Sequence, residues 1–322
     1  MKAAIFKSYG PPEVMKIEEI EKPVPADDEV LVKVRASSVN PAEWYGMTGL
    51  FLARLGNGLF KPKDIRLGTD YAGVVEAVGK NVTQFKPGDE VFGARKGAFA
   101  EYVCARNIVI PKPANISFEQ AGGVAIAAIT ALQGLRDFGK LQAGQKVLIN
   151  GASGGVGTFA VQIAKALGAE VTAVCSTSKV NLIRSLGADH VVDYTKEDFT
   201  RSGERYDLFL DIAGSRSWKD CKRVLKPDAN FVIVGAPKGN RVIGPLAHVT
   251  RLRLASWRAS QKVTFFVASF KCEDFVLLKE MFERGQVKPV VEQTYPLYKI
   301  SEAMRHLGTG HAQGKIIVTM TW

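Results

Sequence analysis

The stretch NGASGGVG, residues 150–157, carries the residues whose types and spacing most clearly suggest chemistry. Its first glycine and its serine fit the pattern G-x-S-x-G, a strained turn that presents the serine nucleophile of a hydrolase. Gly151, Gly154 and Gly157 also fit a spaced-glycine turn that brings backbone N–H groups close to a dinucleotide pyrophosphate. The stretch therefore indicates either a hydrolase that uses Ser153 or a nucleotide-binding protein.

The spacing favours nucleotide binding, because a hydrolase turn has no need of the third glycine. In a dinucleotide-binding turn the first glycine makes the bend, the second lets the backbone approach the phosphates, and the third lets the helix pack against the strand. The small residues Ala160 and Ala164 continue that closely packing helix face. We predict that Ser153 is a turn residue and that the pyrophosphate contacts come from Ser153, Gly154, Gly155, Val156 and Gly157.

The end of the next strand indicates which cofactor is bound. An acidic residue there suits the 2′-hydroxyl of NAD, whereas basic and hydroxyl residues suit the 2′-phosphate of NADP. Glu170 opens the predicted strand 170–175 and so lies at its wrong end, while Ser176, Thr177 and Lys179 follow the strand without a carboxylate. Since these groups offer hydrogen bonds and a charge to a phosphate, we predict NADPH. A helix N-cap with a surface lysine is the alternative.

The order of the predicted elements places this turn in a doubly wound parallel sheet. After a helix at 119–137, strands alternate with helices of roughly ten residues, which is typical of the Rossmann arrangement. The predicted strands are 147–150, 170–175, 190–193, 207–211, 231–234 and 263–267, and the helices between them are 155–168, 179–186 and 216–225.

The two ends of the chain read as β structure, so the tail completes the first domain. Residues 1–115 contain alternating strands and proline-rich turns, and the tail has strands near 290–292 and 315–320 with a helix near 301–308 between them. We predict an α/β fold in which a Rossmann cofactor domain, residues 121–286, is inserted in a mostly-β catalytic domain of residues 1–120 plus 287–322.

The composition is that of a soluble globular protein, with 46% hydrophobic and 23% charged residues. The N-terminus lacks the apolar region of a signal peptide, and the apolar run 121–135 is too short and polar to span a bilayer. We therefore expect a cytoplasmic protein, with the lumen of an organelle as the alternative. The cysteines form no C-x-x-C pair and the histidines no H-E-x-x-H, so we expect neither a metal site nor a disulfide framework.

Part of the net charge of +11 lies in one acid-free segment, residues 238–262. Its cations are Lys238, Arg241, Arg251, Arg253, Arg258 and Lys262. A solvated surface is one interpretation, and contact with an anionic membrane, a quinone headgroup or CoA phosphates is another. Peripheral membrane contact through this segment stays open, and nucleic acid is the least favoured partner.

Several motifs resemble the medium-chain dehydrogenase/reductase superfamily, and within it the zinc-independent quinone oxidoreductases and related enone (alkenal) reductases. Residues 68–73 (GTDYAG), with Gly79 and Val82, reproduce the pattern G-x-[E/D]-x-x-G-x5-G-x-x-V. Further similar segments are 86–91, 97–102 and 314–318, and the resemblance covers essentially the whole chain. It implies a GroES-like catalytic domain and a small-molecule quinone, enone or enal substrate.

The chain departs from the zinc-dependent members of that superfamily at the ligand positions. Asn40 stands where they have Cys and Thr69 where they have His, and Asp70 alone does not make a three-ligand site. Without a Lewis acid to polarise an alcohol, hydride addition to an electrophilic carbon is favoured. Residues 40–43 are similar to the N-P-x-D motif of the quinone oxidoreductases, with Glu43 in place of the aspartate.

The resemblance also implies roles for single residues. Asn40 and Tyr45 would line the substrate side of the nicotinamide as hydrogen-bond donors to a carbonyl oxygen, and Tyr45 would pass a proton through water. Thr130 lies in a segment similar to the helix that touches the nicotinamide. Lys315, after Gly314, would either reach the cofactor or cover the domain joint. Turn or packing roles are the alternatives for these residues.

Further candidates stand at strand ends and among the aromatic residues. Tyr194 ends the third strand, where the family packs an aromatic ring near the adenosine 2′-phosphate. Small residues at Ala213, Gly214, Gly235 and Ala236 would leave room for the cofactor beyond later strands, or form structural turns. An apolar pocket over the nicotinamide would be formed by Phe51, Leu52, Phe60, Phe265 and Phe266, unless these are core residues.

Residues 261–267 form the last strand of the predicted sheet, and a bare apolar edge strand invites pairing. Because members of the family commonly join sheets across that edge, we expect a homodimer.

These observations predict an NADPH-dependent, zinc-free oxidoreductase that transfers hydride to a quinone or an α,β-unsaturated carbonyl compound. The alternatives are an enoyl-thioester reductase and a low-turnover NADPH-binding protein with a structural or membrane-docking role. Oxidation of NADPH by a simple quinone or enone separates the enzyme from the binding protein.

Overall fold

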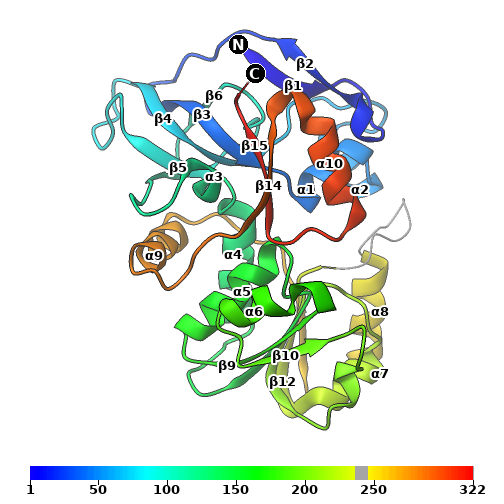
Figure 1. The fold of residues 1–322 in the computed structure, drawn as a ribbon. Coiled ribbons are helices and arrows are strands. Elements are labelled where there is room, and N and C mark those ends of the chain that lie inside the picture. The colour runs from blue at the N-terminus through cyan, green and yellow to red at the C-terminus, as the bar shows by residue number, and fades with distance from the viewer. Residues whose placement is uncertain (236–245, 322) are drawn as a thin grey trace. The chain divides into compact units, whose positions relative to one another are not determined.

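The computed structural model describes residues 1–235 and 246–321, and these form two compact units (Figure 1). Unit 1 consists of residues 1–129 and 270–322, and unit 2 of residues 130–269. These limits differ from the predicted boundaries at 120/121 and 286/287. Helix α9 (Cys272–Glu283) belongs to unit 1, because Phe275 packs on Phe92 with ring centroids 6.2 Å apart.

Unit 2 contains a six-stranded parallel sheet in the order β10-β9-β8-β11-β12-β13. This is the doubly wound Rossmann order, so the predicted fold class is confirmed. Its strands are β8 (Lys146–Asn150), β9 (Glu170–Cys175), β10 (His190–Asp193), β11 (Tyr206–Asp211), β12 (Leu225–Ile233) and β13 (Lys262–Phe265). Its helices are α5 (Gly155–Ala166), α6 (Val180–Ser185), α7 (Trp218–Cys221) and α8 (Leu246–Ser256).

Two predicted helices are interrupted in the structure. The helix expected at 119–137 consists of α3 (Phe118–Ala121), α4 (Ala125–Gln133) and a π turn at Gly134–Phe138. The break falls at Gly122, where a Cβ atom would lie 2.9 Å from Ala36, so a glycine lets the chain pack closely there. The helix expected at 216–225 ends as α7 after four residues, and strand β12 begins already at Leu225.

Unit 1 is built on a seven-stranded sheet in the order β14-β15-β3-β4-β5-β7, with β6 paired to β3, and on a separate hairpin of β1 and β2. The strands are β1 (Lys2–Phe6), β2 (Met15–Glu19), β3 (Val30–Ser38), β4 (Asp70–Val78), β5 (Glu90–Ala94), β6 (Tyr102–Ala105), β7 (Val109–Pro111), β14 (Val291–Pro296) and β15 (Lys315–Thr319). The C-terminal strand β15 pairs with β3, with Ile317 opposite Ser38. This pairing brings the start of β15 next to the end of β3.

Unit 1 also contains the helices α1 (Pro41–Thr48), α2 (Phe51–Asn57), α9 and α10 (Ile300–Thr309), of which only α10 was predicted. Helix α1 begins at the N-cap Asn40, with proline at its first position and Glu43 accepting the N-cap N–H in a capping box. It ends at Gly49, whose φ is +71°. The motif N-P-x-E therefore contains a helix start that the sequence analysis did not use.

Apolar side chains fill a core in each unit. In unit 1, Phe6, Met47 and Met304 belong to a cluster between the sheet and its helices, and in unit 2 Phe209 and Phe231 belong to another. Across residues 1–235 and 246–321, no helix is long and apolar enough to cross a membrane.

The packing of α5 on β8 yields a test of the third glycine. A Cβ atom on Gly157 would lie 2.3 Å from the carbonyl oxygen of Gly151, which is backbone and does not move without shifting the helix. We expect Gly157→Ala to lower the free energy of unfolding by on the order of 1–3 kcal/mol, measured by urea denaturation. Gly154→Ser is the control, because its Cβ meets nothing closer than 3.8 Å. Equal denaturation midpoints for the two variants would contradict this account.

Candidate functional site

The glycine turn of unit 2 has the geometry of a dinucleotide-binding turn. Strand β8 ends at Asn150, Gly151 follows with a φ of +88°, and Gly154 is the N-cap of the twelve-residue helix α5. Gly157 permits the close contact of helix and strand described above. A Cβ on Gly154 would meet nothing closer than the Gly151 carbonyl oxygen at 3.8 Å, so side chains do not crowd the N-terminus of α5, where backbone N–H groups can bind an anion. The three glycines thus fit a bound pyrophosphate.

Ser153 does not have the hydrogen-bond partners that activate a serine nucleophile. Its half-buried side chain makes no hydrogen bond to a histidine or a carboxylate in the described part of unit 2. The preceding Asn150 instead donates to Asp211 Oδ1 at 2.8 Å, and the N–H of Gly214 donates to the same oxygen at 3.0 Å. The hydrolase interpretation of the turn has no structural support.

Asp211, at the carboxyl end of β11, is a residue that the sequence analysis missed. It is fully buried, its Oδ2 atom has no hydrogen-bond partner in the described chain, and burial raises its pKa to about 6. Its position at a strand end could have identified it. Asp211 holds the turn at Ala213 and Gly214, which were predicted to border the cofactor.

A second missed carboxylate lies at the end of β10, beside the last residue of β9. Asp193, the last residue of β10, accepts a hydrogen bond from Thr177 Oγ1 at 2.5 Å. Hydrogen bonds from Thr177 and Thr195 lower the pKa of Asp193 to about 2. Thr177 was predicted to contact a 2′-phosphate, but its hydroxyl hydrogen is already donated to Asp193. Ser176 and Lys179 remain as the half-buried polar residues of this turn.

The other predicted cofactor residues lie as follows. Tyr194 is 49% exposed beside Asp193 at the end of β10, and Thr130 is half-buried in α4. A Cβ on Gly235 would lie 2.1 Å from the carbonyl oxygen of Ile212, so glycine is required there for backbone packing. Ala236 lies outside the described residues. Gly314 has a φ of +80° and precedes Lys315 in unit 1.

Unit 1 contains a buried polar cluster at the ends of three strands. The ammonium group of Lys315, at the start of β15, lies 3.5 Å from Asp70 Oδ2 at the start of β4, and it donates a hydrogen bond to Asn40 Oδ1. The Nδ2 group of Asn40 donates to Asp70 Oδ2 at 3.2 Å and to the carbonyl of Ser38 at 3.2 Å. Lys315 is therefore a member of this cluster.

The cluster leaves Asn40 no free donor. Both hydrogens of its amide are donated and its oxygen accepts from Lys315, while the side chain is 2% exposed. The predicted role of Asn40 as a donor to a substrate carbonyl is therefore not available in this arrangement. Tyr45 is half-buried, its hydroxyl makes no hydrogen bond to another described residue, and burial raises its pKa.

Glu43 joins the cluster to a pocket. It accepts the backbone N–H of Asn40 at 2.9 Å on Oε2 and the Thr69 hydroxyl at 2.8 Å on Oε1. Burial, together with the nearby negative charge of Asp70, raises the pKa of Glu43 to about 7. This residue combines a helix cap with a titratable group.

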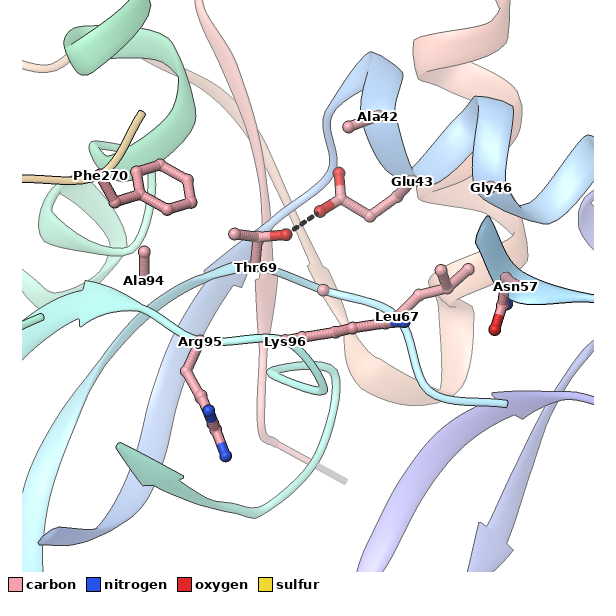
Figure 2. Close-up of a pocket in the computed structure, with 11 residues that line it drawn as sticks. Ala42, Glu43, Gly46, Asn57, Leu67, Thr69, Ala94, Arg95, Lys96 and Phe270 are labelled. Carbon is pink, nitrogen blue, oxygen red and sulfur yellow. Dashed lines mark hydrogen bonds between the residues drawn. The ribbon is translucent and has the colours of Figure 1, made fainter. Parts of the chain in front are cut away.

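Figure 2 shows a pocket of about 490 Å³ in unit 1, with the Glu43–Thr69 hydrogen bond in its wall. Leu67 and Phe270 supply apolar surface, and Arg95 and Lys96 supply cationic side chains. Each cation is paired with a carboxylate. Arg95 Nη2 lies 3.5 Å from Glu29 Oε1, and Lys96 Nζ lies 3.1 Å from Asp64 Oδ2.

The four aromatic residues predicted for a substrate pocket do not line this one. Phe51 is 45% exposed on α2, and Phe60 is 90% exposed after it. In unit 2, Phe265 packs on the core, and Phe266 is buried with its ring stacked 4.3 Å from that of Phe138. The aromatic ring in the pocket wall comes instead from Phe270, at the return of the chain to unit 1.

Two family models match the chain. The model described as "Alcohol dehydrogenase GroES-like domain" matches residues 26–114, and the model described as "Zinc-binding dehydrogenase" matches residues 186–318. In the described part of the chain, no three His, Cys, Asp or Glu side chains are grouped so that they could hold a metal ion.

The chain is similar over nearly its whole length to curated and structurally known oxidoreductases. It is 35% identical to human mitochondrial NAD(P)H oxidoreductase RTN4IP1, covering 99% of this chain and 89% of that protein. It is 34% identical to the chloroplastic NADPH-dependent alkenal/one oxidoreductase of Arabidopsis thaliana, covering 99% and 79%. The quinone oxidoreductase of Coxiella burnetii has the same fold, with a TM-score of 0.87 at 28% identity over 100% and 99% of the two chains. Escherichia coli quinone oxidoreductase complexed with NADPH matches with a TM-score of 0.83 at 27% identity. The match covers 99% of this chain and 100% of that chain.

The buried cluster yields a stability test. Lys315→Met leaves Asp70 buried without its cation, and breaking a buried pair in this way costs about 3–5 kcal/mol. We expect a loss of that size in the free energy of unfolding, measured by urea denaturation. Lys7→Met is the control, because the Lys7–Glu18 pair is exposed and contributes less than about 1 kcal/mol. If both variants lose the same small amount, Lys315 does not stabilise the cluster.

Proposed function

This chain belongs to the quinone oxidoreductase and alkenal/one oxidoreductase group of the medium-chain dehydrogenase/reductase superfamily, and we propose that it transfers hydride from NADPH to a quinone or an α,β-unsaturated carbonyl compound. The observation that carries the proposal is the three-glycine turn at the N-terminus of α5, which is uncrowded at Gly154 and closely packed at Gly157. Relatives at 34–35% identity are named as NAD(P)H or NADPH oxidoreductases, which agrees with this use of the turn.

Unit 2 would hold the cofactor mainly through its backbone. The N–H groups at the start of α5 and the hydroxyl of Ser153 would bind the pyrophosphate. At the end of β9, Ser176 and Lys179 would bind the 2′-phosphate. Thr177 is left out because its hydroxyl donates a hydrogen bond to Asp193. When bound, the reduced nicotinamide supplies the hydride.

The pocket of unit 1 would hold the acceptor. Its apolar wall at Leu67 and Phe270 suits a conjugated carbonyl compound or a quinone ring. Here the protein mainly positions the acceptor and excludes water.

We propose that catalysis needs no zinc. The superfamily's zinc-ligand positions hold Asn40 and Thr69, and both side chains are engaged, Asn40 with Lys315 and Asp70 and Thr69 with Glu43. Activity should therefore survive exhaustive chelation with EDTA or phenanthroline. Stoichiometric zinc that leaves together with the activity would show that a metal takes part.

We propose a homodimer joined through β13. This strand is the last in the sheet order, and within the described chain it pairs only with β12. Unpaired backbone groups at such an edge can bond to a second copy. A monomer by light scattering at micromolar concentration would contradict this assembly.

We also propose peripheral contact of the 238–262 segment, of which residues 238–245 lie outside the described residues, with an anionic membrane. Between Asp228 and Glu273 the sequence has no acidic residue, and α8 and the residues after it expose Leu254 (69%) and Trp257 (74%) next to arginines. Basic and aromatic residues together suit an anionic lipid surface. Failure to cosediment with vesicles rich in phosphatidylserine at low salt would refute this contact.

The reaction is tested with NADPH and a panel of enones, enals, quinones and enoyl-CoA esters. Turnover of enones, enals or quinones supports the proposal, and a preference for enoyl-CoA esters would favour an enoyl-thioester reductase. If the protein oxidises NADPH with none of these acceptors, the proposed function is refuted, and the alternative of a low-turnover NADPH-binding protein is favoured.

The cofactor preference yields a mutational test. Loss of a charge-assisted contact with a phosphate costs about 1.5–3 kcal/mol, roughly ten- to hundredfold in affinity. We expect Lys179→Ala to weaken NADPH binding by that factor, measured by fluorescence titration, and to leave NADH binding nearly unchanged. The control is Lys196→Ala, which removes the cation 3.5 Å from Asp193 and should not affect NADPH specifically. Equal affinities of the wild-type protein for NADPH and NADH would contradict the preference.

A further inference from the structure

The charge balance of the buried cluster in unit 1 favours a proton on Glu43. With both carboxylates ionised, Glu43 and Asp70 place two negative charges against the single positive charge of Lys315. An unpaired buried charge is costly, and one proton makes the cluster neutral. Asp70 lies 3.5 Å from the Lys315 ammonium group and accepts hydrogen bonds from Ser38 Oγ at 2.5 Å and from the N–H of Ile126 at 3.0 Å. The proton therefore belongs on Glu43.

The groups around Glu43 act in opposite directions on its pKa. Burial and Asp70 raise the pKa, and the Thr69 hydroxyl and Lys315 lower it, with a result of about 7. Arg95 and Lys96 line the same pocket, but Glu29 and Asp64 balance their charges. Glu43 is thus an acid that exchanges its proton near neutral pH.

Thr69 connects this acid to the pocket. Glu43 is 3% exposed, whereas Thr69 is half-buried, and its Oγ1 lies 2.8 Å from Glu43 Oε1 (Figure 2). A hydroxyl has one hydrogen to donate. When Glu43 is ionised, that hydrogen points to the carboxylate; when Glu43 is protonated, the acid donates to Thr69 Oγ1 and the hydroxyl hydrogen is free to point into the pocket.

We propose that Glu43 and Thr69 form a proton relay that delivers a proton to the oxygen of an acceptor bound in this pocket. The relay rests on the proposed function and names the source of the proton that the reduction consumes. The acceptor gains a hydride from the nicotinamide at carbon and a proton from Thr69 at oxygen. Thr69 regains its proton from Glu43, and after the product leaves, one H⁺ from solvent returns through the Thr69 hydroxyl to the Glu43 carboxylate. Thr69 touches the acceptor, and Glu43 acts through it.

The relay determines the direction of the pH dependence. The acid form of Glu43 is present below its pKa of about 7 and is lost as the pH rises through that value. Enone reduction should therefore slow above neutral pH. Negative charge on the acceptor oxygen favours transfer of the proton out of the relay.

The test compares kcat for enone reduction, from about pH 5 to about pH 9, in the wild type and three variants. Glu43→Gln keeps the capping box, because glutamine also serves at that position, but it has no proton to give. Thr69→Val removes the hydroxyl, and Thr69→Ser keeps it. A positioned acid contributes about 10²- to 10⁴-fold. We expect Glu43→Gln and Thr69→Val to lose at least tenfold at low pH and to approach the wild type at high pH, and Thr69→Ser to keep the wild-type profile.

Two further variants sharpen the comparison. Thr48→Val is the matched control, since the Thr48 hydroxyl only donates to the Trp44 carbonyl within α1, and it should leave the profile unchanged. Tyr45→Phe tests the rival donor. If that variant loses the pH-dependent limb while Thr69→Val retains it, the proton comes from Tyr45 and the relay is refuted.

A second measurement needs neither cofactor nor turnover. Infrared difference spectra of the wild type minus Glu43→Gln should show one carboxylic acid band that disappears as the pH passes about 7. The band should shift in Thr69→Val, because its hydrogen-bond partner is lost. Absence of the acid band at pH 6 would overturn the relay.

The outcomes separate the two proposals. Turnover with pH profiles unchanged in Glu43→Gln and Thr69→Val refutes the relay alone. Failure of the wild type to oxidise NADPH with any acceptor refutes the proposed function, and with it the delivery of the proton.

Discussion

The buried ion pair between Lys315 and Asp70 is the interaction on which the site in unit 1 depends. Lys315 begins the C-terminal strand β15, and Asp70 begins β4, so the pair forms only when β15 lies against β3. Without this ammonium group the carboxylates of Asp70 and Glu43 would share a buried space with no cation, at a cost of several kcal/mol. The pairing of the last strand is therefore a condition for the site as well as for the sheet.

The same pair explains the roles of the neighbouring polar residues. Because Lys315 and Asp70 occupy every hydrogen-bonding atom of the Asn40 side chain, Asn40 acts as a fixed link and helix cap. Its N–H group in turn holds Glu43, whose second oxygen holds Thr69. A short chain of hydrogen bonds thus connects the Lys315–Asp70 pair to the wall of the pocket. In the proposed relay, the protonation of Glu43 determines which way the Thr69 hydroxyl points.

The glycine turn of unit 2 depends on backbone geometry and not on a buried ion pair. In the proposed function, backbone N–H groups at the helix N-terminus would bind the dinucleotide phosphate, so this site would need room more than side chains. Gly154 leaves that room and Gly157 brings α5 close to β8. The side chains nearby, Asn150 and Asp211, stabilise the turn from behind.

The sequence alone determined the features that depend on local spacing. The glycine turn, the alternation of strands and helices from β8 to β13 and the helix α10 are set by residues close to one another in the chain, so their pattern predicts their backbone geometry. Only the tertiary structure decided which side chains meet. Lys315 reaches Asn40 across 275 residues, Thr177 is bound to Asp193, and Phe270 lines the pocket while Phe60 is exposed. These contacts, and the burial that raises the pKa of Glu43, follow from strand pairing and packing between distant segments, which no local pattern encodes.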